Sequence, residues 1–249
     1  MLCHDDVIVA DWPAPPNVHV VSTTRRGGVS AGPYASLNLA THVGDDAERV
    51  AENRRRLAAL LSLPAEPRWL EQVHGCAVVD AAQHQSIASP CADASFTATP
   101  GVVCAVLTAD CLPIALCDRA GRQVAVAHAG WRGLAAGVVE QTVTALSTPP
   151  PQLLAWLGPA IGSAAFEVGD EVRRVFVATD ATAVHAFLPS RAGHWFADLY
   201  TLARQRLARI GVTEIYGGGW CTWSAQQQFF SYRRDQRCGR MATLAWRSA

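Results

Sequence analysis

Lysine is absent from this chain, since all 21 of its basic residues are arginine. The absence excludes every chemistry that depends on an ε-amino group, including Schiff-base formation, a lysine general base and the P-loop lysine of nucleotide-binding sites. An anion bound by this protein must therefore be held by arginine, by backbone N–H groups or by a metal ion.

Long apolar runs and an excess of basic charge are also missing. No stretch approaches the roughly 20 apolar residues that a bilayer-spanning helix needs. The opening residues, MLCHDD, are polar and acidic where a secretory signal would be basic and then apolar. The 21 acidic residues balance the 21 basic ones, which argues against a general nucleic-acid-binding protein. We therefore expect a cytoplasmic protein without a membrane or nucleic-acid partner, and no sequence feature indicates a protein partner.

The eight cysteines contain no C-x-x-C pair, so the sequence does not indicate a structural zinc knuckle or a thioredoxin-like motif. We expect these eight cysteines to lie in a reducing compartment, where disulfides are rare. Half of the 249 residues are hydrophobic, which is enough for a sizeable core, and no repeat or convincing linker divides the chain. The prolines at 149–151 are followed at once by an apolar segment, so we expect a single domain over residues 1–249.

Apolar runs and helical periodicities alternate along the chain. Strands are expected at Val18–Ser22, Gly101–Leu107, Ile114–Cys117, Gln123–Ala127, Leu153–Leu157, Glu214–Tyr216, Phe229–Tyr232 and Met241–Trp246. Helices are expected at Ala47–Leu61, Leu134–Leu146, Glu167–Val177 and Leu199–Ile210. This interleaving, with some strands joined by hairpin-length turns, predicts an α/β or α+β layered fold with a mixed sheet.

Three residues at polar interruptions between apolar stretches could form a metal site. Cys111 follows the strand expected at 101–107, His128 follows the one at 123–127, and His74 precedes a glycine in the segment EQVHG. Reactive side chains at neighbouring strand ends lie at the rim of a sheet and face a crevice. Two imidazoles and one thiolate suit zinc, and a three-ligand set leaves a fourth position open, as a catalytic site requires.

The same atoms also suit catalysis without a metal. Cys111 could act as the nucleophile with His128 or His74 as its base, and Asp110 or another carboxylate would orient that base. The three residues have no local ligand spacing such as C-x-x-C or H-E-x-x-H, and the chain offers six further histidines and seven further cysteines. The residues alone therefore leave both interpretations open.

A second constellation lies in the loop that follows the strand at 18–22. Arg25 could clamp an anion with two hydrogen bonds, and Gly27 and Gly28 free the backbone for close approach to it. A strand-to-loop turn with an exposed arginine explains the same residues equally well.

Seven segments in register carry a family resemblance that runs from about Val21 to Trp246. They read TTRRGGVSAGPYASLNLATHVGDD, EQVHG, ADASFTATPG, TADCLP, AVAHAGWRG, WLGPAIGSAAFEVGDEV and CTWSAQQQFFSYRRDQRCGRMA. The chain resembles the bacterial laccase-domain family, whose members are called polyphenol oxidases, purine nucleoside phosphorylases or peptidoglycan editing factors. It departs from the family pattern near its end, where Gln236 replaces a usual glycine and Cys238 a usual threonine.

The resemblance implies a layered α/β/β/α fold of the α+β class with mixed sheets, related to a toxin deamidase with a Cys–His pair. It places zinc ligands on His74, Cys111 and His128, with copper as the second metal that it allows. It implies a purine nucleoside enzyme that uses phosphate to cleave adenosine, inosine, guanosine and methylthioadenosine, and that deaminates adenosine. In that enzyme Arg25, Gly27 and Gly28 would hold phosphate, and Asp110 would support a ligand or transfer a proton.

Two alternative enzymes belong to other classes. A peptidoglycan-precursor editing hydrolase would use the same Cys–His centre to remove a wrong amino acid from a cytoplasmic precursor. A copper-dependent polyphenol oxidase (laccase) would need many clustered histidines, whereas the eight histidines here are scattered and form no H-x-H pair. A non-enzymatic role in metal storage is disfavoured, because a three-ligand site is open.

Overall fold

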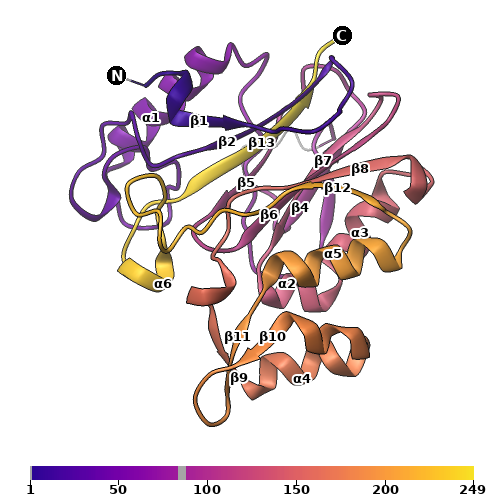
Figure 1. Ribbon diagram of the computed structural model, residues 1–249. Helices are drawn as coiled ribbons and strands as arrows, with labels where there is room; N and C mark the ends of the chain where they lie inside the picture. The colour runs from indigo at the N-terminus through magenta and orange to yellow at the C-terminus, as the bar shows by residue number, and fades with distance from the viewer. Residues whose placement is uncertain (1, 84–87) are drawn as a thin grey trace.

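The computed structural model describes residues 2–83 and 88–249, and two β-sheets packed face to face form its centre (Figure 1). One sheet is antiparallel, in the order β1-β2-β13-β5. Its strands are β1 (Val7–Val9), β2 (Val18–Thr23), β13 (Met241–Arg247) and β5 (Cys104–Thr108). It joins the two ends of the chain, because β13 lies between β2 and β5.

The second sheet is mixed, in the order β12-β8-β6-β7-β4-β3. Its outer pairs, β12 with β8 and β3 with β4, are parallel, and its inner pairs are antiparallel. The strands are β12 (Glu214–Gly217), β8 (Leu153–Leu157), β6 (Leu112–Asp118), β7 (Val124–Ala129), β4 (Ala94–Thr97) and β3 (Val78–Asp80). A small antiparallel sheet of β10 (Phe187–Pro189), β11 (His194–Ala197) and β9 (Glu167–Gly169) lies beside α4 (Asp170–Thr179) at one end of the molecule (Figure 1).

Helices cover the outer faces of both large sheets. They are α1 (Ala47–Leu61), α2 (Trp131–Ala136), α3 (Val138–Ala145) and α5 (Leu199–Arg209); a further short helix, α6 (Tyr232–Asp235), precedes β13. Helix α1 covers the antiparallel sheet, while α2, α3 and α5 cover the mixed sheet (Figure 1). Short 3-10 turns lie at His4–Asp6, Gly32–Tyr34, Pro150–Gln152, Ser163–Ala165 and Ala181–Ala186. No helix in the described ranges is both long and apolar enough to cross a membrane.

The alternation of side chains along each strand explains the layers. In β2, Val20 packs between the two sheets, whereas Val21 packs under α1. In β6, Ile114 packs against the helices of the other side and Ala115 between the sheets. Because both faces of β6 are covered, its sequence is almost continuously apolar.

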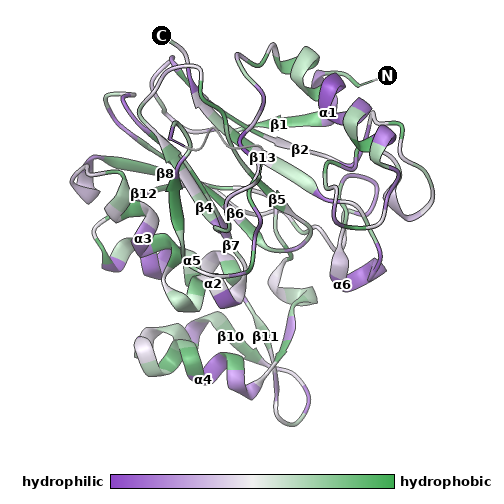
Figure 2. Ribbon diagram, turned by 180° about the vertical axis from the view of Figure 1, so that it is seen from behind, coloured by the Kyte–Doolittle hydropathy of each residue, from purple (hydrophilic) through white to green (hydrophobic). Residues whose placement is uncertain are grey.

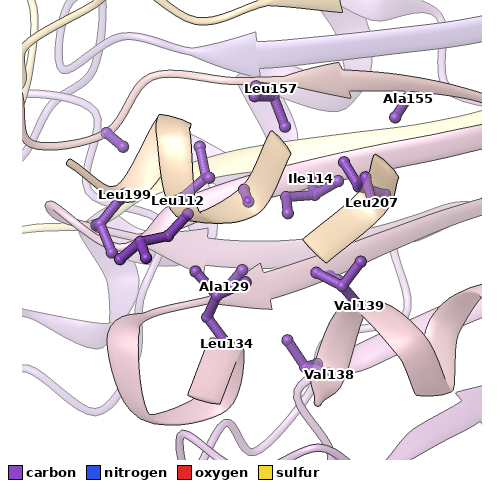
Figure 3. Packing of buried hydrophobic residues seen from close by; sticks show 14 of the residues in the cluster. Leu112, Ile114, Ala129, Leu134, Val138, Val139, Ala155, Leu157, Leu199 and Leu207 are labelled. Carbon is purple, nitrogen blue, oxygen red and sulfur yellow. The ribbon is translucent and has the colours of Figure 1, made fainter. Parts of the chain in front are cut away.

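The outer apolar cluster, with Ile114 of β6, Val139 of α3 and Leu207 of α5, is shown in Figure 3. Hydrophobic residues, drawn green, follow the central strands, and hydrophilic residues, drawn purple, are prominent on α1 and α6 (Figure 2). The order of layers is thus helix, sheet, sheet, helix, and the expected α+β fold with α/β/β/α layers is confirmed.

Several expected elements agree with the structure. Helix α1 has the predicted bounds: the Asp46 carboxylate accepts the backbone N–H of Glu48 at 2.8 Å, and Ser62 ends the helix at φ +47°. Helix α5 ends two residues before Gly211, which has φ +89°. Strand β7 extends two residues further than expected, to Ala129, so His128 lies within the strand.

Two expected elements were wrong in part and one was wrong as a whole. The single helix expected at 134–146 is two helices, because Gly137 adopts φ +94° and ends α2. The helix expected from Glu167 begins only at Asp170, since residues 167–169 pair with β11. The strand expected at 229–232 does not form: Phe229 and Phe230 pack against Met241, and both edges of β13 are already paired with β2 and β5.

Candidate metal centre

His74, Cys111 and His128 meet at one edge of the mixed sheet. Strands β6 and β7 are antiparallel neighbours with Leu112 opposite Ala129, so the start of β6 and the end of β7 lie together. Cys111 precedes β6 and His128 lies near the end of β7, which brings side chains 17 positions apart in the sequence into contact range. The expected proximity is therefore present, although its cause is an antiparallel pair rather than two parallel strand ends. His74 comes from the loop before β3.

The geometry of the three side chains fits one metal ion. Cys111 Sγ lies 3.9 Å from His74 Nε2, and one ligand atom from each residue lies within 4.8 Å of the others. Tetrahedral zinc with bonds of about 2.0–2.3 Å places its ligand atoms about 3.3–3.6 Å apart. Small side-chain rotations would bring all three atoms onto one ion, so the donor set and its spacing fit zinc.

Asp93 positions both histidines, and the sequence reasoning did not identify it. Its carboxylate is fully buried and accepts the Nδ1–H of His128 at 2.8 Å. It also accepts the backbone N–H groups of His74 and Gly75 at 2.9 and 2.6 Å. With Nδ1 occupied, Nε2 of His128 is left to face the centre, as in the carboxylate–histidine–metal arrangement of many sites.

Glycine at position 130 leaves room for the ligands. A Cβ atom there would lie 2.7 Å from Cys111 Sγ and 3.2 Å from Cδ2 of His74. The backbone also departs from common conformations beside the ligands: His74 has φ +61° and Asp110 has φ +91°. Such φ values are uncommon outside glycine and cluster at functional sites.

The charges of Cys111 and His128 support each other. Burial opposes ionisation of the Cys111 thiol, but the charge of His128 and hydrogen bonds with His128 and His74 outweigh it and lower the pKa to about 6. Burial likewise opposes protonation of His128, yet the Cys111 thiolate and the Asp93 carboxylate raise its pKa to about 9. The thiolate is the form that binds a metal or acts as a nucleophile. A metal ion would displace the proton from Nε2 of His128.

Asp110 is occupied by the C-terminal part of the chain. Its carboxylate accepts the hydroxyls of Thr222 and Ser231 at 2.6 and 3.0 Å. It also accepts the backbone N–H of Arg233 at 2.7 Å. Asp110 therefore fixes residues 222–233 beside the centre, and a role in proton transfer stays a prediction.

The loop with Arg25, Gly27 and Gly28 lies against a different pocket. The Arg25 guanidinium donates to the carbonyls of Ala35 and Gln226 at 2.8 and 3.2 Å and stacks on a phenylalanine ring. A Cβ atom at Gly28 would lie 2.1 Å from the carbonyl oxygen of Ser36, so this glycine allows two backbone segments to pack. The pocket at Arg25 shares no lining residue with the cavity at Cys111, and phosphate binding by this loop stays a prediction.

A cavity of about 470 Å³ opens in front of the three ligands. Its lining combines apolar and polar side chains, as the lining of small-molecule sites commonly does. The apolar lining includes Trp131, Ile161, Phe166, Leu199 and Tyr232, and the polar lining includes His42, Gln72, Thr108, Asp110, Arg132 and Arg240. The departures at Gln236 and Cys238 lie in the loop that leads to Arg240, and Gln236 has the positive φ of +58° that the usual glycine would accommodate.

Comparison with known proteins gives close relatives over nearly the whole chain. The sequence profile described as "Multi-copper polyphenol oxidoreductase laccase" matches residues 19–248. Purine nucleoside phosphorylase YfiH of Escherichia coli (strain K12) is 55% identical over 240 residues, which are 96% of this chain and 98% of that protein. The purine nucleoside phosphorylase of Haemophilus influenzae is 45% identical over 238 residues, or 95% of this chain and 97% of that protein.

Solved structures agree with the fold. The crystal structure of Neisseria meningitidis protein NMB0706 matches with a TM-score of 0.95 at 50% identity, and the match covers 98% of this chain and 100% of that one. The structure of YlmD from Geobacillus stearothermophilus matches with a TM-score of 0.87 at 36% identity, and covers 95% of this chain and 94% of that one.

Proposed function

Since the chain belongs to the multi-copper polyphenol oxidoreductase laccase family, as its seven motifs predicted, we propose that it is a zinc-dependent enzyme acting on purine nucleosides. It cleaves adenosine, inosine, guanosine and methylthioadenosine with phosphate, and it deaminates adenosine. The observation that carries the proposal is the convergence of His74, Cys111 and His128 at a cavity of small-molecule size. The names of its 55% and 45% identical relatives support the phosphorylase activity.

Zinc is the proposed metal because the donor set is two imidazoles and one thiolate, whose ligand atoms lie within 4.8 Å of one another and need only small side-chain rotations to reach one zinc ion. A bound zinc ion would supply a Lewis acid and would make a water in its open position more acidic. Multicopper oxidation needs several histidine clusters, whereas residues 2–83 and 88–249 contain this single cluster of three or more potential metal ligands.

The protein's own residues would bind and orient the substrate. Trp131, Phe166 and Tyr232 offer aromatic surface on which a purine base can stack. Asp93 would hold His128 with Nε2 toward the centre, and Gly130 would keep the space beside Cys111 clear. In phosphorolysis the C1′–N9 bond breaks, a phosphate oxygen takes C1′, and the base leaves with a proton. In deamination water replaces the amino group of adenosine, which leaves as ammonia.

The test is to incubate purified protein with adenosine, with and without phosphate, and to follow the products by chromatography. We expect inosine in both mixtures, and adenine with ribose 1-phosphate only when phosphate is present. Cys111→Ala is the inactive control, and Cys91→Ala, at an exposed free cysteine, should behave as wild type. Product levels no higher than those of Cys111→Ala would reject the proposal.

A peptidoglycan-precursor editing hydrolase remains the second candidate. The cavity adjoins another pocket, and the two share Trp131, Arg132 and Phe166, so a longer substrate could cover both. This candidate predicts hydrolysis of a peptide-bearing nucleotide sugar and indifference to free adenosine. Both candidates place the enzyme in the cytoplasm, without a membrane, nucleic-acid or protein partner.

A further inference from the structure

The cavity at the metal centre has an excess of positive charge. Among its lining residues the arginines are Arg132 and Arg240, and the acid is Asp110. That carboxylate already accepts three hydrogen bonds from Thr222, Ser231 and the backbone of Arg233. The described lining residues therefore leave both guanidinium groups without an acidic partner, and an anion entering the cavity would meet uncompensated positive charge.

Arg132 has its hydrogen-bonding groups free. It forms no hydrogen bond or ion pair through its side chain with any part of the chain that the structure describes. Its guanidinium carbon lies 4.5 Å from the centroid of the Trp131 ring, a cation–π contact that uses none of its N–H groups. An arginine that lies against an aromatic ring and still has free donors is suited to bidentate binding of a phosphoryl group.

Arg240 is anchored on one side only. Its Nη1 donates to the carbonyls of Cys238 and Gly239 at 2.9 and 3.0 Å. Within the described ranges neither Nε nor Nη2 has a hydrogen-bond partner, so both remain for a ligand. Its charge also acts on His42, another lining residue: burial and then Arg240 lower the pKa of that imidazole.

Arg25 differs from both residues. Its Nε and Nη1 already donate to backbone carbonyls, and the glycines beside it pack against Leu2 and Ser36. Its pocket does not include a metal ligand. A phosphate bound there would be outside the cavity in which a nucleoside could reach the metal centre.

We propose that Arg132 and Arg240 bind the phosphoryl group of the substrate in the metal-centre cavity, in place of the Arg25 loop. For phosphorolysis the proposal rests on the proposed function, because the phosphoryl group is then free phosphate, the co-substrate. The same pair would serve the diphosphate of a larger anionic substrate such as a nucleotide sugar, and direct binding experiments separate these two sources.

The experiment is calorimetric titration of the zinc-loaded protein at constant ionic strength, with inorganic phosphate in one arm and a nucleoside diphosphate in the other. The variants are Arg132→Gln, Arg240→Gln, Arg240→Lys and Arg25→Gln. Arg119→Gln is the charge-matched control, because Arg119 lies just past the opposite end of β6, exposed and 3.7 Å from Glu214. Zinc content and melting temperature are measured for each variant, and Arg240→Lys retains the charge if loss of the Arg240 anchor disturbs the loop.

We expect Arg132→Gln and Arg240→Gln each to weaken phosphate binding at least about tenfold, as loss of a hydrogen bond to a charged group does. Arg25→Gln and Arg119→Gln should bind as wild type, and Arg240→Lys should lie between. Equal binding by all variants, or weaker binding only in Arg25→Gln, would overturn the inference. So would a wild-type protein that binds neither ligand.

The two proposals can fail separately. If wild type makes no ribose 1-phosphate but binds the nucleoside diphosphate through Arg132 and Arg240, the inference holds and the phosphorylase proposal fails. If wild type is a phosphorylase whose Michaelis constant for phosphate is unchanged in both variants, the phosphorylase proposal holds and the inference fails.

Discussion

The loop at residues 24–28 and the segment at residues 130–133 resemble each other in sequence, since each follows a strand and combines arginine with two glycines. In the first, Gly28 faces the backbone of Ser36 and Leu37, and Arg25 donates to carbonyls. In the second, Gly130 faces the Sγ of Cys111 and the ring of His74. In both regions a glycine near an arginine allows another part of the chain to approach closely. Where that part is backbone, the glycine serves packing, and where it is a metal ligand, the glycine serves the metal site.

The largest expected effect is a loss of stability at Gly28 without a change in metal binding. Gly28→Ala should lower the free energy of unfolding by about 3 kcal/mol, since the new Cβ would lie 2.1 Å from a backbone oxygen that cannot rotate away. Zinc affinity of the folded protein should not change. Urea denaturation measures the first quantity and titration against a chelating dye the second.

Gly32→Ala is the matched control for this loop. Gly32 has φ +58°, but no atom lies within 4 Å of the place that a new Cβ would take, so the substitution adds only conformational strain, about 1 kcal/mol. Equal losses in the two variants would show that steric contact at Gly28 is not the reason for its glycine.

The next prediction concerns Gly130, where a substitution should change metal binding. Gly130→Ala should weaken zinc binding about 100-fold, the upper end of what a change behind a metal ligand costs, because its Cβ would displace Cys111 Sγ. Gly75→Ala, directly beside His74, should bind zinc as wild type, since its Cβ would meet Asp93 Oδ2 at an ordinary 3.5 Å. The same dye measures both zinc affinities. Equal affinities for Gly130→Ala and Gly75→Ala would show that contact with Cys111 Sγ is not the reason for the glycine at position 130.

A smaller loss is expected at the carboxylate behind His128. Asp93→Asn should reduce zinc affinity about 10-fold to 100-fold, because the neutral amide orients His128 less well and makes its Nε2 a weaker donor to the metal. The matched control is Asp118→Asn, which alters a buried carboxylate that holds the turn of Arg122 and Gln123 at the far end of β6. That control should lower stability and leave zinc affinity unchanged. A loss of zinc affinity in Asp118→Asn but not in Asp93→Asn would show that Asp93 does not support the metal ligands.

The role of Asp93 could not be predicted from the sequence. The three expected ligands each interrupt an apolar stretch next to a strand, and such interruptions are visible in one dimension. The contact between Asp93 and His128 depends on the pairing of β4 with β7, which places Ala94 opposite Ala127. Since strand pairing is set by the whole sheet, the acidic residue within Ala92–Ala94 gave only a weak signal.

The fold was predictable to a similar extent. Helix α1 was recovered because its hydrophobic periodicity lies within one segment. Phe229 and Phe230 were misassigned to a strand because their β propensity is overridden by burial against Met241, in a sheet with no free edge at β13. Local signals thus predicted local structure, whereas partners distant in sequence decided the remainder.

The smallest expected effect concerns the metal-free centre. After zinc removal by a chelator, the Cys111 thiolate should form with a midpoint near pH 6, because the charge of His128 and its hydrogen bonds outweigh burial. Iodoacetamide should therefore alkylate Cys111 at a rate that rises up to about pH 7 and then levels off. N-acetylcysteine, as a free thiol with a pKa of about 8.5, should keep gaining rate up to pH 9 or above. At pH 7 the alkylation rates of Cys111 and N-acetylcysteine should differ only a few-fold, since a thiolate of lower pKa is less nucleophilic.

Peptide mapping by mass spectrometry follows the modified residue. A rate that still rises tenfold between pH 7 and 9 would mean that His128 is not protonated beside Cys111, and added zinc should stop the reaction because it takes the thiolate as a ligand.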